Sequence, residues 1–301
     1  MKVLVTGAGG FIGSHTVEGL RNSGHDVVCT DFTDSRWIKD IVRLDITKAE
    51  DITNFVAREK PDVVFHSAGK INKQGGIDIP LEDLMVNVGG TINVLEGMRK
   101  YGCKKIVFTS SGGTLYGDTL SQPAKEGHKK EPMSPYALNK ILSEEYITLY
   151  NRLYGIEYVI LRYTRVYGPR QYTGSSQGVP IIFIDNILKG IRPKIYGDGS
   201  QTRDFIYISD VVSANLSALS WRNEIVNIGT QTEVSILEVL NIIEKILGSN
   251  TEPEFLSERK ADLRRVLLDI THAKELGWEP KVEIEEGLKK TVEWYKSELG
   301  I

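Results

Sequence analysis

Short runs of apolar residues alternate with segments of helical spacing along the first half of the chain. The runs that predict strands are 2–6, 25–30, 41–44, 62–66, 105–110 and 158–163. The segments that predict helices are 14–22, 48–60, 84–101 and 136–154. Strands that are apolar on both faces belong in a parallel sheet covered by helices. The strict alternation therefore predicts an α/β fold with a doubly wound parallel sheet, whose ligands bind beyond the carboxyl ends of the strands.

The pattern changes after about Gly168, where segments become shorter and richer in Gly, Pro and Arg. Two polar loops in this half carry arginines, at 197–204 and 258–265. We therefore expect residues 1–167 to form the large sheet domain, and residues 168–301 to form mainly a smaller substrate-binding region. The isolated apolar run at 224–228 is expected to return to the large sheet.

Composition and charge exclude several classes of function. Hydrophobic residues make up 41% and charged residues 26% of the 301 residues, and the net charge is −3. Because no long basic tract is present, nucleic acid is not expected as a partner. No signal-like segment and no run of about 18 apolar residues is visible, so we expect a soluble cytoplasmic protein without membrane contact. Cys29 and Cys103 have no metal-ligand spacing, so we expect two buried thiols and no metal site.

The first strand leads directly into a glycine-rich turn, TGAGGFIG, at 6–13. Gly7, Gly10 and Gly13 leave a backbone without side chains, which a pyrophosphate can approach closely. The N-terminus of the following helix then offers free N–H groups and a positive dipole end to that anion. The pattern predicts a dinucleotide site, although a purely structural turn could have the same composition.

Two carboxylates follow the next two strands. Asp31, at the end of the second, can accept the hydroxyls of the adenosine ribose and repel a 2′-phosphate, which favours NAD over NADP. Asp45 follows the third strand and is expected to contact the adenine amino group. For Asp31, the alternative is an aspartate that only begins a turn.

Tyr136 and Lys140 form a Y-x-x-x-K pair on a predicted helix, where a spacing of four residues brings both onto one face. A tyrosine hydroxyl with a pKa of about 10 is a poor base at neutral pH. A neighbouring ammonium and a positively charged nicotinamide would stabilise its phenolate. Ser111, after the fifth strand, can hydrogen-bond the same substrate oxygen. The alternative is a surface helix that happens to carry a Tyr and a Lys.

These motifs together resemble those of the extended short-chain dehydrogenase/reductases, specifically the NAD-dependent nucleotide-sugar epimerase/dehydratase family, and most of all its UDP-hexose 4-epimerases. The resemblance covers nearly the whole chain. It rests on the motifs TGAGGFIG (6–13), FHSAGK (65–70), NVGGTIN (87–93), SSGGTLYG (110–117), SPYALNK (134–140), LRYTRVYGPR (161–170), GDGSQTRDFIY (197–207) and GWEP (277–280).

The resemblance implies a role for each matching residue. Residues 1–167 would be a Rossmann-type NAD-binding domain, and residues 168–301 would mainly bind the nucleotide sugar. Tyr136 would be the catalytic base, Lys140 its partner and Ser111 a hydroxyl donor to the substrate. The implied NAD contacts are Gly7, Gly10, Phe11, Ile12, Gly13, Asp31, Asp45, Ile46, Ala68, Lys70, Asn87, Ser110, Tyr136, Lys140 and Tyr163. The implied substrate contacts are Ser111, Tyr136, Arg165, Arg203, Arg259 and Asp262.

Three departures from the family pattern change the expectation. Gly112 and Gly113 stand where 4,6-dehydratases carry an acidic pair, which disfavours the elimination of water. Thr164 and Arg165 replace the Phe-Asn pair whose asparagine normally touches the diphosphate, so Arg165 is a candidate to take over that contact. The segment after Asp31 is short, which predicts a more open adenosine end.

The implied reaction is epimerisation at C4 of a nucleotide-linked hexose, with UDP-glucose/UDP-galactose or the N-acetylated pair as candidates. Tyr136 would take the proton of the 4-hydroxyl, tightly bound NAD would take the hydride, and the 4-keto sugar would turn before the hydride returns. A reductase of a 4-keto nucleotide sugar, which consumes NAD(P)H, is the alternative enzyme. A non-catalytic dinucleotide sensor is a third hypothesis, but it would not need Ser111, Tyr136 and Lys140 together. The resemblance also implies a homodimer joined by a four-helix bundle of the helices at 84–101 and 136–154.

Overall fold

The computed structural model describes residues 1–71, 76–119, 122–172, 178–258 and 263–301, and within these residues its largest sheet has seven strands. Its strand order is β11-β6-β5-β4-β1-β2-β3, and the pairs from β6 to β3 are all parallel. The strands are β1 (Lys2–Thr6), β2 (Asp26–Asp31), β3 (Val42–Arg43), β4 (Val63–His66), β5 (Lys105–Ser110), β6 (Glu157–Tyr163) and β11 (Glu224–Ile228). The predicted doubly wound parallel sheet is confirmed. Its order reverses between β1 and β4, the point where such sheets bind ligands.

The chain divides into two compact units that interleave along the sequence. The first comprises residues 1–115, 132–162 and 212–226, and the second comprises 116–131, 163–211 and 227–301. The sequence pattern suggested a division near residue 167, with the strand at 224–228 returning to the large sheet, and β11 does lie in that sheet. The chain also enters the second unit at Tyr116, directly after the short helix α5 (Gly112–Leu115), and returns to the first unit at Pro132.

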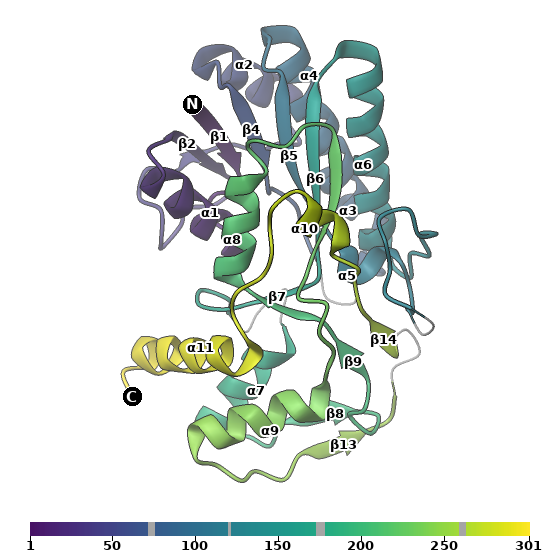
Figure 1. Cartoon of the computed structure of the whole chain (residues 1–301). Helices are drawn as coiled ribbons and strands as arrows, with labels where there is room; N and C mark the ends of the chain where they lie inside the picture. The colour runs from purple at the N-terminus through teal and green to yellow at the C-terminus, as the bar shows by residue number, and fades with distance from the viewer. Residues whose placement is uncertain (72–75, 120–121, 173–177, 259–262) are drawn as a thin grey trace. The chain divides into compact units, whose positions relative to one another are not determined.

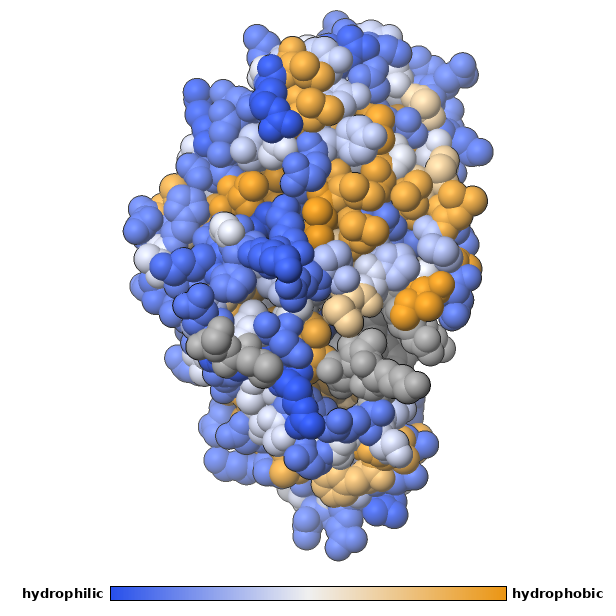
Figure 2. All heavy atoms as spheres, turned by 90° about the vertical axis from the view of Figure 1, so that its right-hand side faces the viewer, coloured by the Kyte–Doolittle hydropathy of each residue, from blue (hydrophilic) through white to orange (hydrophobic). Residues whose placement is uncertain are grey.

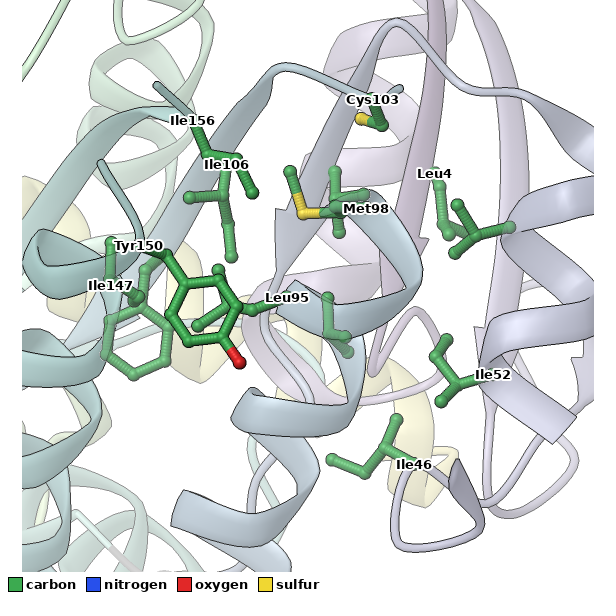
Figure 3. Packing of buried hydrophobic residues seen from close by; sticks show 14 of the residues in the cluster. Leu4, Ile46, Ile52, Leu95, Met98, Cys103, Ile106, Ile147, Tyr150 and Ile156 are labelled. Atoms are coloured by element: carbon green, nitrogen blue, oxygen red, sulfur yellow. The ribbon is translucent and has the colours of Figure 1, made fainter. Parts of the chain in front are cut away.

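Helices α2 (Ala49–Glu59), α4 (Gly90–Tyr101) and α6 (Pro135–Tyr154) accompany the sheet of the first unit (Figure 1). Ile52 of α2, Leu95 of α4 and Ile147 of α6 are completely buried in one cluster with the strand residue Ile106, as Figure 3 shows. Each such side chain contributes about 1.5–3 kcal/mol when it leaves water. Helix α1 (Phe11–Asn22) is joined to the end of α8 (Ile208–Ser217) by a hydrogen bond from Asn215 Nδ2 to Thr16 Oγ1 at 2.8 Å.

The predicted long helix at 84–101 is interrupted. It begins earlier, with α3 (Pro80–Leu84), passes through one π-helical turn, η2 (Met85–Gly89), and only then continues as α4. The widened turn carries Asn87, whose side-chain amide donates to Asp83 O at 3.1 Å. Turns of this kind are frequent at functional sites.

The described residues of the second unit form short strands and several helices. Its strand pairs are β7 (Arg165–Tyr167) with β10 (Phe205–Tyr207), β8 (Lys194–Tyr196) with β13 (Glu254–Leu256), and β9 (Thr202–Arg203) with both β12 (Val234–Ser235) and β14 (Arg265–Val266). Its helices are α7 (Val179–Leu188), α9 (Ile236–Leu247), α10 (Thr271–Glu275) and α11 (Ile284–Leu299). Helix α9 begins with a capping box, in which Ser235 and Glu238 bond each other's backbone N–H.

The two expected buried thiols are confirmed. Cys29 and Cys103 are both buried free thiols, and burial raises the pKa of each to about 11. Across the residues that the structure describes, no helix is both long and apolar enough to cross a membrane.

Candidate dinucleotide site and catalytic dyad

The glycine turn between β1 and α1 is fixed by contacts that leave no room for side chains. Gly7 has a φ of +72°, and a Cβ there would lie 2.6 Å from the backbone nitrogen of Ala68. A Cβ on Gly13 would lie only 2.0 Å from the carbonyl oxygen of Gly7. These two glycines therefore let the helix and the loop after β4 approach the turn closely.

The same turn offers a place for an anion. Gly10 is the N-cap of α1, and no side chain caps this helix among the described residues. The N–H groups of the first turn, from Phe11 to Gly13, lack intrahelical acceptors by construction, and the helix dipole adds positive potential there. A cradle of bare backbone at a helix N-terminus fits the pyrophosphate of a dinucleotide.

The carboxylate of Asp31 lies beside this turn. Its Oδ2 accepts a hydrogen bond from the backbone N–H of Gly9 at 2.9 Å, and its Oδ1 accepts from that of Thr33 at 3.2 Å. Asp45 is held differently, because its Oδ1 accepts both the N–H and the hydroxyl of Thr47, at 2.9 and 2.7 Å. Ile46 is buried, and its carbonyl accepts from Asn93 Nδ2 at 2.9 Å.

The end of β4 carries a fully buried histidine. His66 Nδ1 lies 2.7 Å from Thr6 Oγ1, and Nε2 lies 3.1 Å from Thr91 Oγ1. The Thr91 hydroxyl donates its own proton to the carbonyl of Asn87 at 2.6 Å, so it can only accept from His66. The ring is therefore neutral with its proton on Nε2, and burial, with the charge of Lys140, lowers its pKa to about 3.

Asn87 holds the loop that follows His66. Its Oδ1 accepts from the backbone N–H of Lys70 at 3.0 Å, and its Nδ2 donates to the carbonyl of the same residue at 2.9 Å. A Cβ on Gly69 would lie 2.8 Å from Asn87 Oδ1. The backbone at Ala68–Lys70 is thus fixed beside the glycine turn, while the Lys70 side chain forms an ion pair with Glu82.

Tyr136 and Lys140 lie on the first turns of α6, whose N-cap is Ser134. Ser134 accepts from the backbone N–H of Ala137 at 3.2 Å, and Pro135 takes the first helical position. Lys140 is only 5% exposed, and its Nζ donates to the carbonyl of Thr109 at 2.8 Å. The ammonium also lies 5.8 Å from the centre of the Tyr136 ring.

The buried ammonium of Lys140 has an altered pKa. Burial lowers this pKa to about 8, against the opposing effect of the carboxylates of Glu144 and Asp83. Lys140 is therefore still mostly protonated at neutral pH, which is the state that stabilises a nearby phenolate.

The two serines after β5 have different surroundings. Ser111 is half-buried, and its Oγ lies 2.9 Å from the hydroxyl of Thr114, which also lies 3.3 Å from the Ser111 carbonyl oxygen. Ser110 is buried and donates to Glu144 Oε1 at 2.6 Å. Gly112 and Gly113 begin the short helix α5 (Gly112–Leu115). Because both are glycines, this position offers no acidic side chain.

The remaining predicted residues lie in the second unit. Tyr163 and Arg203 are buried and Arg165 is half-buried, and Arg203 Nη1 donates to the carbonyl of Thr202 at 2.7 Å. Thr164, the first residue of the unusual Thr-Arg pair, donates through its hydroxyl to the carbonyl of Asp204 at 2.7 Å. Arg259 and Asp262 lie outside the described residues.

Sequence reasoning missed three charged residues near the dyad. Glu144 follows Lys140 by one helical turn, Arg162 bonds Glu144, and Asp83 accepts from Asn139 Nδ2 at 2.8 Å. The spacing of Lys140 and Glu144 was a signal that could have identified Glu144. Arg162 lies in the motif LRYTRVYGPR but was assigned no role, and no pattern along the chain pointed to Asp83.

A glycine turn after the first strand, a carboxylate after the second, and a Tyr-Lys dyad on the helix after the fifth define a short-chain dehydrogenase/reductase. The chain matches the NAD dependent epimerase/dehydratase family over residues 3–229, and it belongs to that family. It is therefore an NAD-dependent enzyme, and the bare glycine cradle beside Asp31 fits that cofactor.

Several relatives resemble the chain over nearly its full length. A putative UDP-glucose 4-epimerase of Methanocaldococcus jannaschii is 46% identical over 98% of both chains. A crystal structure of a UDP-glucose 4-epimerase from Thermotoga maritima with UDP-glucose is 39% identical, with a TM-score of 0.95 over 99% of this chain and 100% of that one. The Thermus thermophilus UDP-glucose 4-epimerase complex with NAD is 36% identical, with a TM-score of 0.92 over 98% and 99%.

Proposed function

We propose that this enzyme epimerises C4 of a UDP-linked hexose, and that the pair it interconverts is UDP-glucose and UDP-galactose. The observation that carries the proposal is the dyad itself: Tyr136 on the same helical face as a buried Lys140 whose ammonium is bonded to the end of β5. The absence of side chains at Gly112 and Gly113 argues against dehydration. The relatives at 36–46% identity described above are UDP-glucose 4-epimerases by name, which supports the choice of sugar.

Each residue of the dyad has a definite task in this proposal. Tyr136, as phenolate, removes the proton from the sugar 4-hydroxyl and later returns it. Lys140 lowers the pKa of that phenol by its positive charge, and Ser111 donates a hydrogen bond to the same oxygen. When bound, NAD supplies the chemistry of reversible hydride transfer at C4.

The negatively charged diphosphate of the UDP-hexose requires cationic groups in its binding site. In the proposal, Arg203 and Arg165 hold the diphosphate, because guanidinium groups bind phosphate oxygens through two parallel hydrogen bonds. Arg259 is a further candidate for that contact, and Asp262 for the uridine ribose. The sugar itself stays weakly held so that the keto form can turn, while the nucleotide provides the binding energy.

The proposal is tested by adding UDP-hexoses to the purified protein without added cofactor and following the sugars by NMR. The panel contains UDP-glucose, UDP-N-acetylglucosamine and UDP-glucuronate, because relatives at 31–35% identity carry the names of epimerases for the last two. Interconversion of UDP-glucose and UDP-galactose with retained NAD is expected. Tyr136→Phe is expected to abolish turnover but to bind UDP as wild type does.

Other outcomes would change the assignment. Conversion of another sugar would replace the proposed substrate. No conversion of any of them, together with NADH oxidation by a 4-keto nucleotide sugar, would make the enzyme a reductase. Wild-type turnover in Tyr136→Phe would remove the tyrosine from the mechanism.

We further propose that the enzyme is a homodimer through α3, η2 and α6. Large apolar side chains on these elements are exposed: Leu81 by 71%, Met85 by 51% and Leu153 by 60%. Figure 2 turns the side of α6 toward the viewer, and a band of hydrophobic residues crosses it. Helices with exposed apolar faces of this kind pair readily into a four-helix bundle.

Light scattering after size exclusion measures this assembly directly. Wild type is expected at twice the chain mass of 33.7 kDa. Leu153→Glu is expected at the mass of a single chain. Leu299→Glu, at an exposed leucine in α11, is the matched control and should remain dimeric. A monomeric wild type would refute the dimer.

A further inference from the structure

Helix α6 is attached to the end of β5 by two adjacent hydrogen bonds. Lys140 Nζ donates to the carbonyl of Thr109 at 2.8 Å, and Ser110 Oγ donates to Glu144 Oε1 at 2.6 Å. Thr109 and Ser110 are consecutive in the strand, and Lys140 and Glu144 are one turn apart in the helix. The pair of bonds therefore fixes both the height and the rotation of α6 at the dyad.

Arg162 completes this attachment from the next strand. It is the register partner of Ser110 in the pairing of β5 with β6. Its Nε donates to Glu144 Oε1 at 2.9 Å and its Nη2 to Oε2 at 2.6 Å, so the guanidinium binds the carboxylate through both oxygens. Both side chains are only 1% exposed.

A buried ion pair contributes little net free energy to the attachment of a helix to a sheet. Its desolvation offsets much of its attraction, and well-packed apolar residues of similar volume often hold a fold equally well or better. The need to hold α6 on the sheet therefore does not explain why this pair is ionic. The position of Glu144 explains it, because Glu144 lies one helical turn from Lys140 on the same face of α6.

The groups around the Lys140 ammonium are almost all neutral. From β5 it meets the Thr109 carbonyl and the ring of Phe108, 4.6 Å from the ring centre. From α6 it meets Tyr136, and from β4 the neutral His66. Two carboxylates favour its charged form, Glu144 from α6 and Asp83 from α3. Loss of either carboxylate would leave a single compensating anion for a cation that is 5% exposed.

We propose that the buried Glu144–Arg162 pair is a positioning unit for the dyad. It orients α6 on the ends of β5 and β6, and its carboxylate keeps the Lys140 ammonium protonated beside Tyr136. Glu144 and Arg162 act through Lys140 and need no contact with the substrate. The inference rests on the proposed function only where it concerns turnover, since the state of Lys140 is a property of the protein itself.

The test measures the protonation of Lys140 directly. The NAD-bound enzyme is prepared with lysine labelled with ¹³C at Cε, and the Lys140 resonance is identified by its loss in Lys140→Arg. Its titration midpoint in wild type is compared with that in Glu144→Gln and in the double variant Glu144→Gln/Arg162→Met. Glu59→Gln is the control, because Glu59 is also ion-paired in the first unit, and its carboxylate bonds Lys2 and Arg58 rather than a residue of the dyad.

We expect the midpoint to fall by about one pH unit or more in Glu144→Gln, the usual effect of losing a nearby opposite charge. The double variant removes both buried charges, so it should regain the stability that the single variant loses while its Lys140 midpoint stays below that of wild type. The alkaline limb of kcat should move with the midpoint, with little change in KM. Glu59→Gln should titrate like wild type.

Two results would overturn the proposal. A wild-type midpoint in both Glu144 variants would show that the carboxylate does not control the lysine. Full recovery of kcat by the double variant across the alkaline range would show that the pair only holds the fold. If wild type turned over no UDP-hexose, the proposed function would fail, but the midpoints would still decide the role of Glu144.

Discussion

The neutral His66 at the end of β4 makes the stability of this protein depend on pH in a way that can be calculated. Burial lowers its pKa from 6.5 to about 3. Between these values the unfolded chain binds a proton that the folded protein does not, so stability falls as the pH drops below about 6.5. One pKa unit corresponds to about 1.4 kcal/mol. The full difference is about 5 kcal/mol, and about 3 kcal/mol of it is already lost at about pH 4.5.

The substitution His66→Gln isolates this contribution. A glutamine can accept from Thr6 and donate to Thr91, as the neutral histidine does, but it does not titrate. Asp204, whose pKa burial raises to about 6, titrates in both proteins and cancels in their difference. The stability difference between wild type and variant should therefore shift by about 3 kcal/mol, in favour of the variant, between about pH 8 and about pH 4.5.

Urea unfolding followed by tryptophan fluorescence measures both proteins, at one NAD concentration and several pH values. Each protein gives a free energy of unfolding at each pH. The test follows how the difference between the two free energies changes with pH. Parallel pH curves for the two proteins, within about 0.5 kcal/mol, would refute the reasoning, because they would mean that His66 already binds its proton in the folded state.

Three further substitutions probe the cofactor turn, the cofactor choice and the second unit. Gly13→Ala places a methyl group 2.0 Å from the Gly7 carbonyl, and the strain of about 1–3 kcal/mol should weaken NAD binding by about fivefold to about a hundredfold, measured by calorimetry. Asp31→Asn keeps an acceptor for Gly9 but removes the charge, so the ratio of NADP to NAD affinity should rise about tenfold; an unchanged ratio would exclude Asp31 from the ribose site. Thr164→Val removes the hydroxyl bonded to Asp204 and should cost about 1 kcal/mol in thermal unfolding, whereas an unchanged melting temperature would mean that this bond contributes nothing.

Much of the first unit was predictable because its signals are local. The strand at 2–6, the helix that follows it and the helix at 136–154 were all predicted within three residues of their observed bounds. Periodicity, glycines and the Ser134–Pro135 cap act over a few residues, so they can be recognised in the chain alone. The third strand, predicted at 41–44, is observed at Val42–Arg43, the two residues that pair with β2 at the sheet edge.

The helix at 84–101 shows where local signals end. Its apolar spacing is uniform, yet the structure inserts a π-helical turn at Met85–Gly89. That turn carries Asn87, which is bonded to the backbone of Lys70 in another part of the chain. A partner so distant in sequence leaves no periodic trace, so the irregular turn could not be inferred from spacing.

The sequence by itself determined the doubly wound sheet, the glycine turn and the Tyr-Lys dyad, because each depends on residues that lie close together in the chain. The tertiary structure alone decided the charges that act on the dyad. Glu144, Arg162 and Asp83 reach Lys140 or its neighbours from α6, β6 and α3. Their effect arises from burial and short distances in a medium of low dielectric constant, and both exist only once the chain has folded.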